Sequence, residues 1–196
     1  IMNFSSQWFY DGKVKAAPQT AHRGILDYDN PMEWIDDSSY DEGDSGETFV
    51  GETFGRVNKP EAHKVMEVLQ AYFGKIGKSR ILDESIDVGI ISPYRAQVHY
   101  LRHLIKKNVF FKPFRHLLSV NTVDGFQGQE RDVIIVSLVR NNADGQIGFL
   151  RDLRRMNVAM TRARSKLIII GDHKTLSHNS FYDKLYKYVQ DTSRSL

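Results

Sequence analysis

Two arginines stand beside a strand-like segment near the end of the chain, and both need an anionic partner. The segment 156–172 reads MNVAMTRARSKLIIIGD. Arg162 and Arg164 end a helix-like run and directly precede the letters LIII, which predict a buried strand. A guanidinium stays charged at pH 7 and forks onto carboxylate or phosphate oxygens. The sequence therefore predicts either structural ion pairs or a phosphate-containing ligand here.

The preceding residues predict an amphipathic helix over 150–163. At 100° per residue an apolar face lies opposite a basic one. The apolar face holds Leu153, Met156 and Met160, and the basic residues are Arg151, Arg154, Arg155 and Arg162. For Arg151 and Arg154 a solvated face with salt bridges explains the pattern as well as a ligand does. For Arg162 the motifs described below favour a ligand.

A second group of polar residues lies in SVNTVDGFQGQERDVIIVSLVR, residues 119–140. Strands are expected over 117–123 and 132–139, with a glycine-containing loop between them. Ligands of parallel α/β sheets bind beyond the carboxyl ends of the strands, so we expect this loop to be well placed for a ligand. Gln127 and Glu130 have side chains that can bind ribose hydroxyls. An ordinary turn is the alternative interpretation of the composition.

A third group lies in IISPYRAQV, where Ser92, Pro93 and Tyr94 stand between an expected strand (86–92) and an expected helix (94–108). Backbone N–H groups at a helix start suit phosphate. By itself this signal has little specificity.

The surrounding pattern predicts an α/β domain. Strands that are apolar throughout alternate with amphipathic helices, which is typical of a mainly parallel sheet. At 196 residues the chain suits one domain. Further expected helices are 4–10, 58–75 (capped by Asn58, with Pro60 in its first turn) and 179–190; further expected strands are 24–30 and 166–172.

Charge is distributed unevenly along the chain. Residues 24–55 hold ten of the 24 acidic residues and no Lys or Arg, so the remainder carries a surplus of 13 positive charges. A basic body suits a polyanionic partner and a solvated surface of mixed charge equally well. The acidic, loop-rich segment 27–52 should repel phosphate, so we expect it on an outer face. The absence of cysteine excludes disulfides and cysteine metal sites. No apolar run has the length of a membrane span, and we expect no membrane partner and a cytoplasmic location.

Together the three groups resemble conserved motifs of the superfamily 1 helicases. The motifs are ISPYRAQV, VNTVDGFQGQERDVIIVSLVR and RRMNVAMTRARSKLIIIGD, in this order. The likeness is strongest to the 5′-to-3′ group that includes the nonsense-mediated-decay RNA helicase and its bacterial DNA helicase relatives. IMNFSSQWFYDG is similar to the segment that follows the Q-Y-R-M-H signature of that group. The likeness covers nearly the whole chain, with 27–52 least typical.

The resemblance implies a RecA-like three-layer domain, the second of two in an ATP-dependent motor. Residues 1–196 would form this single C-terminal domain of a longer protein. The first domain would hold the P-loop and the acids that bind Mg²⁺, and no G-x-x-x-x-G-K-[ST] occurs in this sequence. We therefore expect the isolated chain to be unable to hydrolyse ATP, with Mg²⁺ held by the first domain.

The resemblance also implies roles for individual residues. Arg162 resembles an arginine finger, which makes it the expected catalytic residue, and Glu130 resembles a ribose contact. Gln127 and Arg140 match positions that link the nucleotide to the nucleic acid. Residues that match contacts to the backbone of a single strand are Ser92, Pro93, Tyr94 and Thr122. Arg164 is expected to be structural, paired with Asp132 or Asp152.

Several alternatives stay open at this point. The strand could be DNA or RNA, and we favour DNA. A non-catalytic module that binds nucleic acid or a protein partner is the alternative to a motor. The aromatic residues 8–10 could stack on bases, although packing is favoured. The stretch 106–115, with lysines, an arginine and three phenylalanines, suits an accessory nucleic-acid patch and a helix end above the core equally well.

Overall fold

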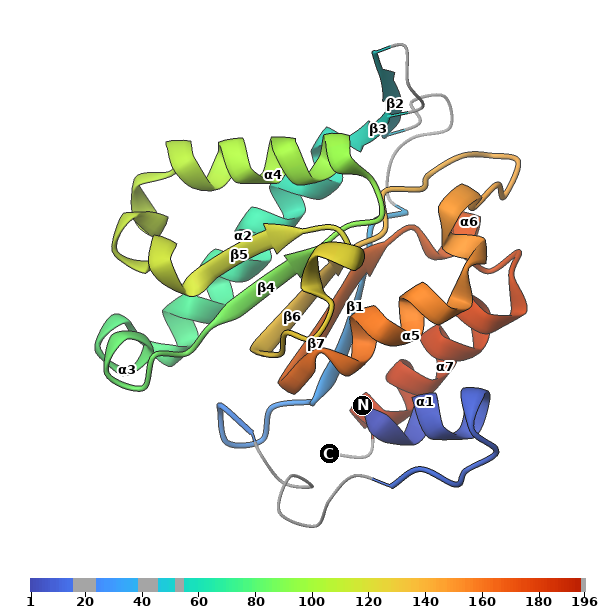
Figure 1. Ribbon diagram of the computed structural model, residues 1–196, viewed down its shortest axis with the longest axis horizontal. Coiled ribbons are helices and arrows are strands. Elements are labelled where there is room, and N and C mark those ends of the chain that lie inside the picture. Colours follow the sequence, from blue (N-terminus) through green and yellow to red (C-terminus); the bar gives the residue numbers. More distant parts are fainter. Residues whose placement is uncertain (16–23, 39–45, 52–54, 195–196) are drawn as a thin grey trace.

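A parallel sheet of five strands lies between two layers of helices in the computed structural model (Figure 1). The structure describes residues 1–15, 24–38, 46–51 and 55–194. The strands of this sheet are β1 (Met32–Asp36), β4 (Val88–Ile91), β5 (Leu118–Asn121), β6 (Arg131–Ser137) and β7 (Ala163–Gly171). The helices are α1 (Met2–Phe9), α2 (Lys59–Ile76), α3 (Lys78–Asp83), α4 (Arg95–Lys107), α5 (Leu153–Thr161), α6 (His173–Leu176) and α7 (Ser180–Arg194). Short 3-10 turns are η2 (Val109–Leu117), η3 (Asp124–Phe126) and η4 (Gly148–Arg151).

The order of the strands is β1-β7-β6-β4-β5, and each neighbouring pair is parallel. In the centre, Ile135 of β6 lies opposite Ile90 of β4 on one side and Ile168 of β7 on the other. Strands covered on both faces need apolar side chains in both directions, which explains the continuous apolar runs. The expected α/β fold of the RecA-like, P-loop NTPase type is confirmed.

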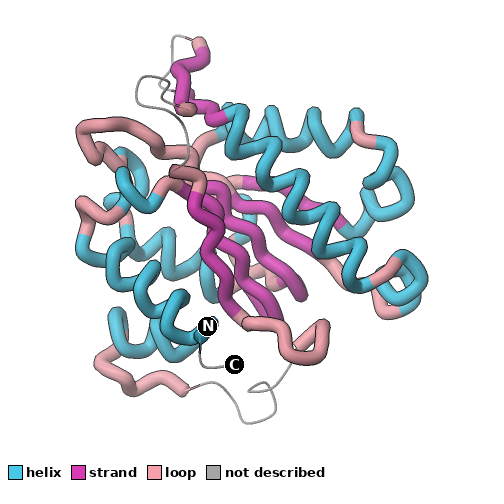
Figure 2. Tube along the Cα trace, turned by 180° about the vertical axis from the view of Figure 1, so that it is seen from behind, coloured by secondary structure: helices cyan, strands magenta, loops and turns pink. Residues whose placement is uncertain are grey.

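Helices cover both faces of the sheet (Figure 2). One core is formed with α2, α3, α4 and η2, and includes an edge-to-face contact of Phe73 and Phe114 at 5.0 Å. The other core is formed with α1, α5, α6 and α7, in which Trp8 meets Phe181 at 5.2 Å. The packing interpretation of the N-terminal aromatic residues is therefore confirmed for Trp8.

The first strand of the sheet was not where the sequence predicted it. Residues 24–31 form turns and irregular backbone, so the prediction of a strand over 24–30 is wrong. The strand begins at Met32 and pairs with β7, with Trp34 buried. Asp29, in the turn segment, instead accepts a hydrogen bond of 2.6 Å from Lys166 of β7. This five-residue edge strand, MEWID, has two charged positions, so it lacks the continuous apolar run by which the central strands were recognised.

A hairpin projects beyond the carboxyl ends of the main strands (Figure 1). It consists of β2 (Glu47–Val50) and β3 (Gly55–Asn58), paired antiparallel. The sequence analysis expected the acidic segment 27–52 to be rich in loops, and its residues 39–45 and 52 lie outside the described part of the chain. Glu47 is buried, so the acidic segment contributes to the interior at this point.

The stretch after α4 packs its aromatic residues inward. Phe111 and Phe114 of η2 are buried, and Asn108 accepts a hydrogen bond of 2.9 Å from the backbone N–H of Phe110. Lys106 and Lys112 are exposed. These contacts favour a helix end above the core over an aromatic nucleic-acid patch.

Candidate functional site

The polar loop between β5 and β6 runs from one edge of the sheet to the other. It leaves the carboxyl end of β5 at Thr122 and enters the amino end of β6 at Arg131. Because both strands are parallel to β4, the chain must travel back along the sheet to begin the second one. Only the first part of the loop therefore lies at the carboxyl edge, where the sequence analysis expected a ligand. Asp124 is near that edge, and Gln127 and Glu130 lead to the opposite one.

Phe126 fixes the path of this loop. Its ring is buried in the core beneath α5, against β4. A Cβ atom on Gly89 would lie 2.8 Å from this ring and 2.8 Å from Ile134, a distance that real contacts do not show. The missing side chain of Gly89 thus leaves the space into which the Phe126 ring packs.

The amino edge of the sheet brings Glu130 and Arg162 together although they are far apart in the sequence. Arg162 ends α5 and directly precedes β7, and Glu130 directly precedes β6. The backbone N–H of Arg131 donates to the carbonyl of Arg162 over 3.0 Å. Arg131 also donates to the carbonyl of Glu130 (2.8 Å) and to the side chain of Gln129 (2.9 Å). These bonds set the end of the loop beside Arg162.

Arg162 and Arg164 have different surroundings. The Arg164 guanidinium lies 2.7 Å from Asp87 and 3.2 Å from Asp132. The expected structural pair of Arg164 with Asp132 is confirmed. Its second partner is Asp87, and not Asp152, which the sequence analysis had named as the alternative. The half-buried Arg162 donates from Nε to the carbonyl of Val158 (3.3 Å), and no carboxylate of the described residues pairs with it. Its guanidinium is the one of the two that remains available to an anion.

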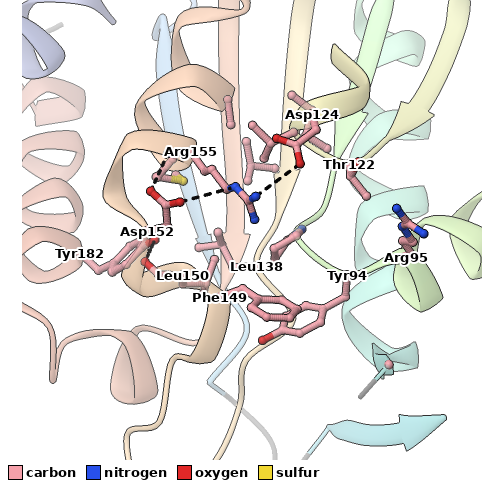
Figure 3. A pocket seen from close by; sticks show the side chains of 17 residues that line it. Tyr94, Arg95, Thr122, Asp124, Leu138, Phe149, Leu150, Asp152, Arg155 and Tyr182 are labelled. Atoms are coloured by element: carbon pink, nitrogen blue, oxygen red, sulfur yellow. Dashed lines mark hydrogen bonds and ion pairs between the residues drawn. The ribbon is translucent and has the colours of Figure 1, made fainter. Parts of the chain in front are cut away.

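At the carboxyl edge a cavity of about 540 Å³ opens between β4, β5 and α5 (Figure 3). Pro93, Tyr94 and Thr122 line it, so three of the expected nucleic-acid contacts lie together. Ser92 is fully buried beside them, and its hydroxyl has no hydrogen-bond partner within the described ranges. Tyr94 is buried as well and stacks on Phe149, at 5.2 Å between ring centres.

Arg140 lies at this same carboxyl edge and not with Gln127. It follows β6 and is only 3% exposed. Its Nε donates to Glu47 of the hairpin over 2.7 Å. Gly148, with φ 52°, has no side chain, and this leaves room for the guanidinium and for the Tyr94 hydroxyl. Burial acts to lower the pKa of Arg140, but hydrogen bonds and charges of Glu47 and Tyr94 outweigh it and raise the pKa.

The start of α2 holds the backbone that precedes Arg140. Val139 has φ 71°, which is strained for a β-branched residue. Its N–H donates to both carboxylate oxygens of Glu61 (2.9 and 3.0 Å), and its carbonyl accepts from Asn58 Nδ2 (3.0 Å). Ser137 also donates to Glu61, and Gln97 donates to Ser137. We infer that this buried network keeps Val139 in its unusual conformation and so directs Arg140 toward Glu47.

Glu61, Glu47 and Gln97 were missed by the sequence analysis. The one available signal was Asn58-x-x-Glu61, the spacing of a capping box. Asn58 does cap α2, accepting from the N–H of Glu61 over 2.9 Å. The reciprocal bond is made by Gln97 instead, which accepts from the N–H of Asn58. Glu61 is thereby free to bind Val139, a partner that only the tertiary structure supplies.

Glu61 should make the stability of the fold depend on pH. Burial raises the pKa of Glu61 from 4.5 to about 8, against the hydrogen bonds of Ser137 and Val139. Between these values the folded chain keeps a proton that the unfolded chain has lost, so a rise in pH favours unfolding. We expect this group to lower the unfolding free energy by up to about 1.4 kcal/mol per pH unit in that range. Urea unfolding of wild type and Glu61→Gln between pH 5 and 8 checks this.

The glutamine variant cannot ionise, so its stability should change less with pH. Glu67→Gln is a matched control, because Glu67 is an exposed residue of the same helix. It should follow the wild-type dependence. An unchanged slope in Glu61→Gln would contradict the raised pKa.

The comparisons with known proteins all match this chain to the same kind of protein. A family model described as AAA domain matches residues 1–174. An uncharacterized ATP-dependent helicase of Methanocaldococcus jannaschii is 33% identical over 97% of this chain and 27% of its own length. The DNA polymerase alpha-associated DNA helicase A of Saccharomyces cerevisiae is 36% identical over 90% of this chain and 26% of its own length. A regulator of nonsense transcripts 1 homolog of Neurospora crassa is 32% identical over 97% of this chain and 17% of its own length.

The chain thus spans between 9% and 27% of the length of the curated relatives reported for it. Among the helices that the structure describes, none has the length and apolar character needed to cross a membrane. The described ranges also contain no group of three or more His, Asp or Glu side chains arranged to hold a metal ion.

Proposed function

The chain belongs to the superfamily 1 helicases, in the group related to the nonsense-mediated-decay helicase, and on this premise we propose that it is the second motor domain of an ATP-dependent helicase. Residues 1–196 would form one C-terminal RecA-like domain. The first RecA-like domain of the same protein would be its partner and would hold the P-loop. ATP would bind between the two domains.

The observation that carries this proposal is the meeting of Arg162 and Glu130 at the amino edge of β6 and β7. Arg162 has an accessible guanidinium without a carboxylate partner in the described chain, and Glu130 is exposed. A fixed cation and an exposed carboxylate suit a nucleotide, whose phosphates are anionic and whose ribose donates hydrogen bonds. Gln127 belongs to the same loop and is exposed too.

In the proposed mechanism Arg162 stabilises the negative charge that develops on the γ-phosphate as it is transferred. Glu130 accepts hydrogen bonds from the ribose. Gln127 and Arg140, at the two edges of the sheet, are proposed to couple the nucleotide to the nucleic acid through the domain. Mg²⁺, when bound by the first domain, would neutralise phosphate charge; no acidic cluster in the described part of this chain fits such a role.

The carboxyl edge is proposed to bind the single strand. Ser92, Pro93, Tyr94 and Thr122 follow β4 and β5. The partly exposed Pro93 and Thr122 would contact the backbone of the strand, and the buried Ser92 and Tyr94 would support them. Backbone contacts carry no sequence information, so the motor would move along strands of any sequence. We favour DNA over RNA as the strand.

ATP binding would draw the two domains together through Arg162, and hydrolysis would release them. Alternating grip by the two domains would convert this cycle into movement along one strand. The isolated chain, with its own finger but no P-loop, should not hydrolyse ATP.

The test is ATP hydrolysis by the full-length protein, without nucleic acid and with single-stranded DNA or RNA of equal length. We expect turnover that is stimulated by a single strand, more by DNA than by RNA, and none for the 196-residue chain alone. Binding of single strands without any turnover by a folded full-length protein would instead identify a non-catalytic module, the alternative function. Turnover by the isolated chain would overturn the assignment as a second domain.

A further inference from the structure

Phe149 presents an open aromatic face at the rim of the 540 Å³ cavity. It is 55% exposed and follows Gly148 in the η4 turn. One side of its ring stacks on the buried Tyr94, with 28° between the planes (Figure 3). Tyr94 is fixed by burial and by its contact with Arg140, so the Phe149 ring rests on a rigid support.

The cavity combines an apolar floor with polar groups at its rim. The floor is formed by strand ends and by α5, with Ile91, Val136, Leu138, Met156 and Ala159 among its residues. The rim carries two arginines and two aspartates, Arg95, Arg155, Asp124 and Asp152. A volume of about 540 Å³ lies in the range of small-molecule sites. The opposite charges cancel, which favours a neutral occupant over a phosphate.

Arg155 is held loosely at this rim. It lies 3.5 Å from Asp124 and 3.5 Å from Asp152, and its side chain is 53% exposed. Both distances exceed the 2.7–2.9 Å that is usual for charged hydrogen bonds, and exposed pairs contribute little to stability. An arriving ligand can therefore take hydrogen bonds from Arg155 or give them to the aspartates without a large cost.

A nucleobase has the properties that this cavity would recognise: a neutral ring with flat faces, and an edge of donors and acceptors. We propose that the cavity receives one unstacked base of the bound single strand, with Phe149 as its stacking surface and Arg155, Asp124 and Asp152 facing its edge. This rests on the proposed function, in which the strand crosses this edge of the sheet. Phe149 is then a nucleic-acid-binding residue in addition to those expected from the motifs.

The test is the affinity of the full-length protein for a fluorescent dT oligonucleotide and for one of equal length with abasic sites. Removing an aromatic ring on which one base stacks commonly lowers the affinity for the strand about tenfold. We expect that fall for Phe149→Ala and Phe149→Leu on the dT strand, and near wild-type affinity for Phe149→Trp. On the abasic strand the wild type should already be weakened, and Phe149→Ala should add little.

Tyr28→Ala is the matched control, since Tyr28 is an aromatic residue that is 96% exposed and precedes the amino end of β1. It should bind as the wild type does. Phe149→Leu keeps an apolar side chain at this position but has no ring. A loss of affinity in this variant is therefore due to lost stacking and not to a folding defect. If the wild type binds but Phe149→Ala weakens both strands equally or neither, the base site is refuted and the motor proposal stands. If the wild type binds no single strand, both fail.

Discussion

Replacing Arg162 by alanine in the full-length protein should lower the single-strand-stimulated rate of ATP hydrolysis by about tenfold or more, with arginine fingers of other systems contributing ~10³–10⁵. The physical reason is the loss of a fixed positive charge next to the γ-phosphate at the moment its negative charge is greatest. Among the residues that the structure describes, the Arg162 side chain makes one weak hydrogen bond, at 3.3 Å to the carbonyl of Val158, so the fold should survive the change. Steady-state turnover with saturating ATP measures the effect.

Two further variants sharpen this test. Arg162→Lys keeps a charge but loses the planar fork, so we expect a rate between those of wild type and alanine. Arg80→Ala is the control. Arg80 is an exposed arginine of α3, in the helical layer on the other face of the sheet from α5, and it pairs with the nearby Glu84. Its replacement should leave turnover unchanged. A full rate in Arg162→Ala would remove the finger role while leaving the motor proposal intact.

Replacing Glu47 by alanine should strongly destabilise the domain. Glu47 accepts hydrogen bonds from Arg140 (2.7 Å), Arg56 (3.0 Å) and the backbone N–H of Asn141 (3.0 Å). Because Arg140 is only 3% exposed, its charge would be left buried without this carboxylate. Breaking one side of a buried pair costs about 3–5 kcal/mol. Urea unfolding of the chain, followed by circular dichroism, gives the change in unfolding free energy.

A double variant distinguishes the cost of leaving one buried charge without its partner from the cost of removing both charges. Glu47→Met with Arg140→Met replaces both charges by apolar groups and should be less destabilised than Glu47→Ala alone. The control Lys187→Ala breaks an exposed ion pair with Asp183 on α7, and it should hardly change the urea concentration at which half of the protein is unfolded. A loss in Glu47→Ala no greater than in Lys187→Ala would show that the hairpin is not anchored through this pair.

The regular elements could be predicted because their signals are local. β6 and β7 each contain four consecutive apolar residues, at 133–136 and 167–170, as a strand covered on both faces requires. The start of α2 was readable from Asn58 and the proline after it, and Asn58 does cap the helix. β1 and the β2–β3 hairpin were not predicted, because these short strands interrupt their apolar residues with charged and exposed ones. The equally short β4 was predicted because all four of its residues are apolar or glycine and buried.

The candidate site was predictable as a set of residues but not as an arrangement. The motifs indicated Arg162, Glu130 and Gln127, and the structure describes the first two at one edge of the sheet. Nothing local could show that the loop between β5 and β6 travels back along the sheet, with its own Phe126 packed against β4. That path depends on the parallel pairing of both strands with β4.

By itself the sequence determined the family, the α/β fold and most helices and strands, and it indicated the residues to which the proposed motor function is assigned, because motifs and periodicity are properties of neighbouring residues. The tertiary structure decided which arginine side chains are paired with a carboxylate and which are not. Arg164 finds Asp87, 77 positions away, and Arg140 finds Glu47, 93 positions away, whereas Arg162 meets no carboxylate among the described residues. Electrostatic partners are set by strand order and packing, and those emerge only when distant segments come together.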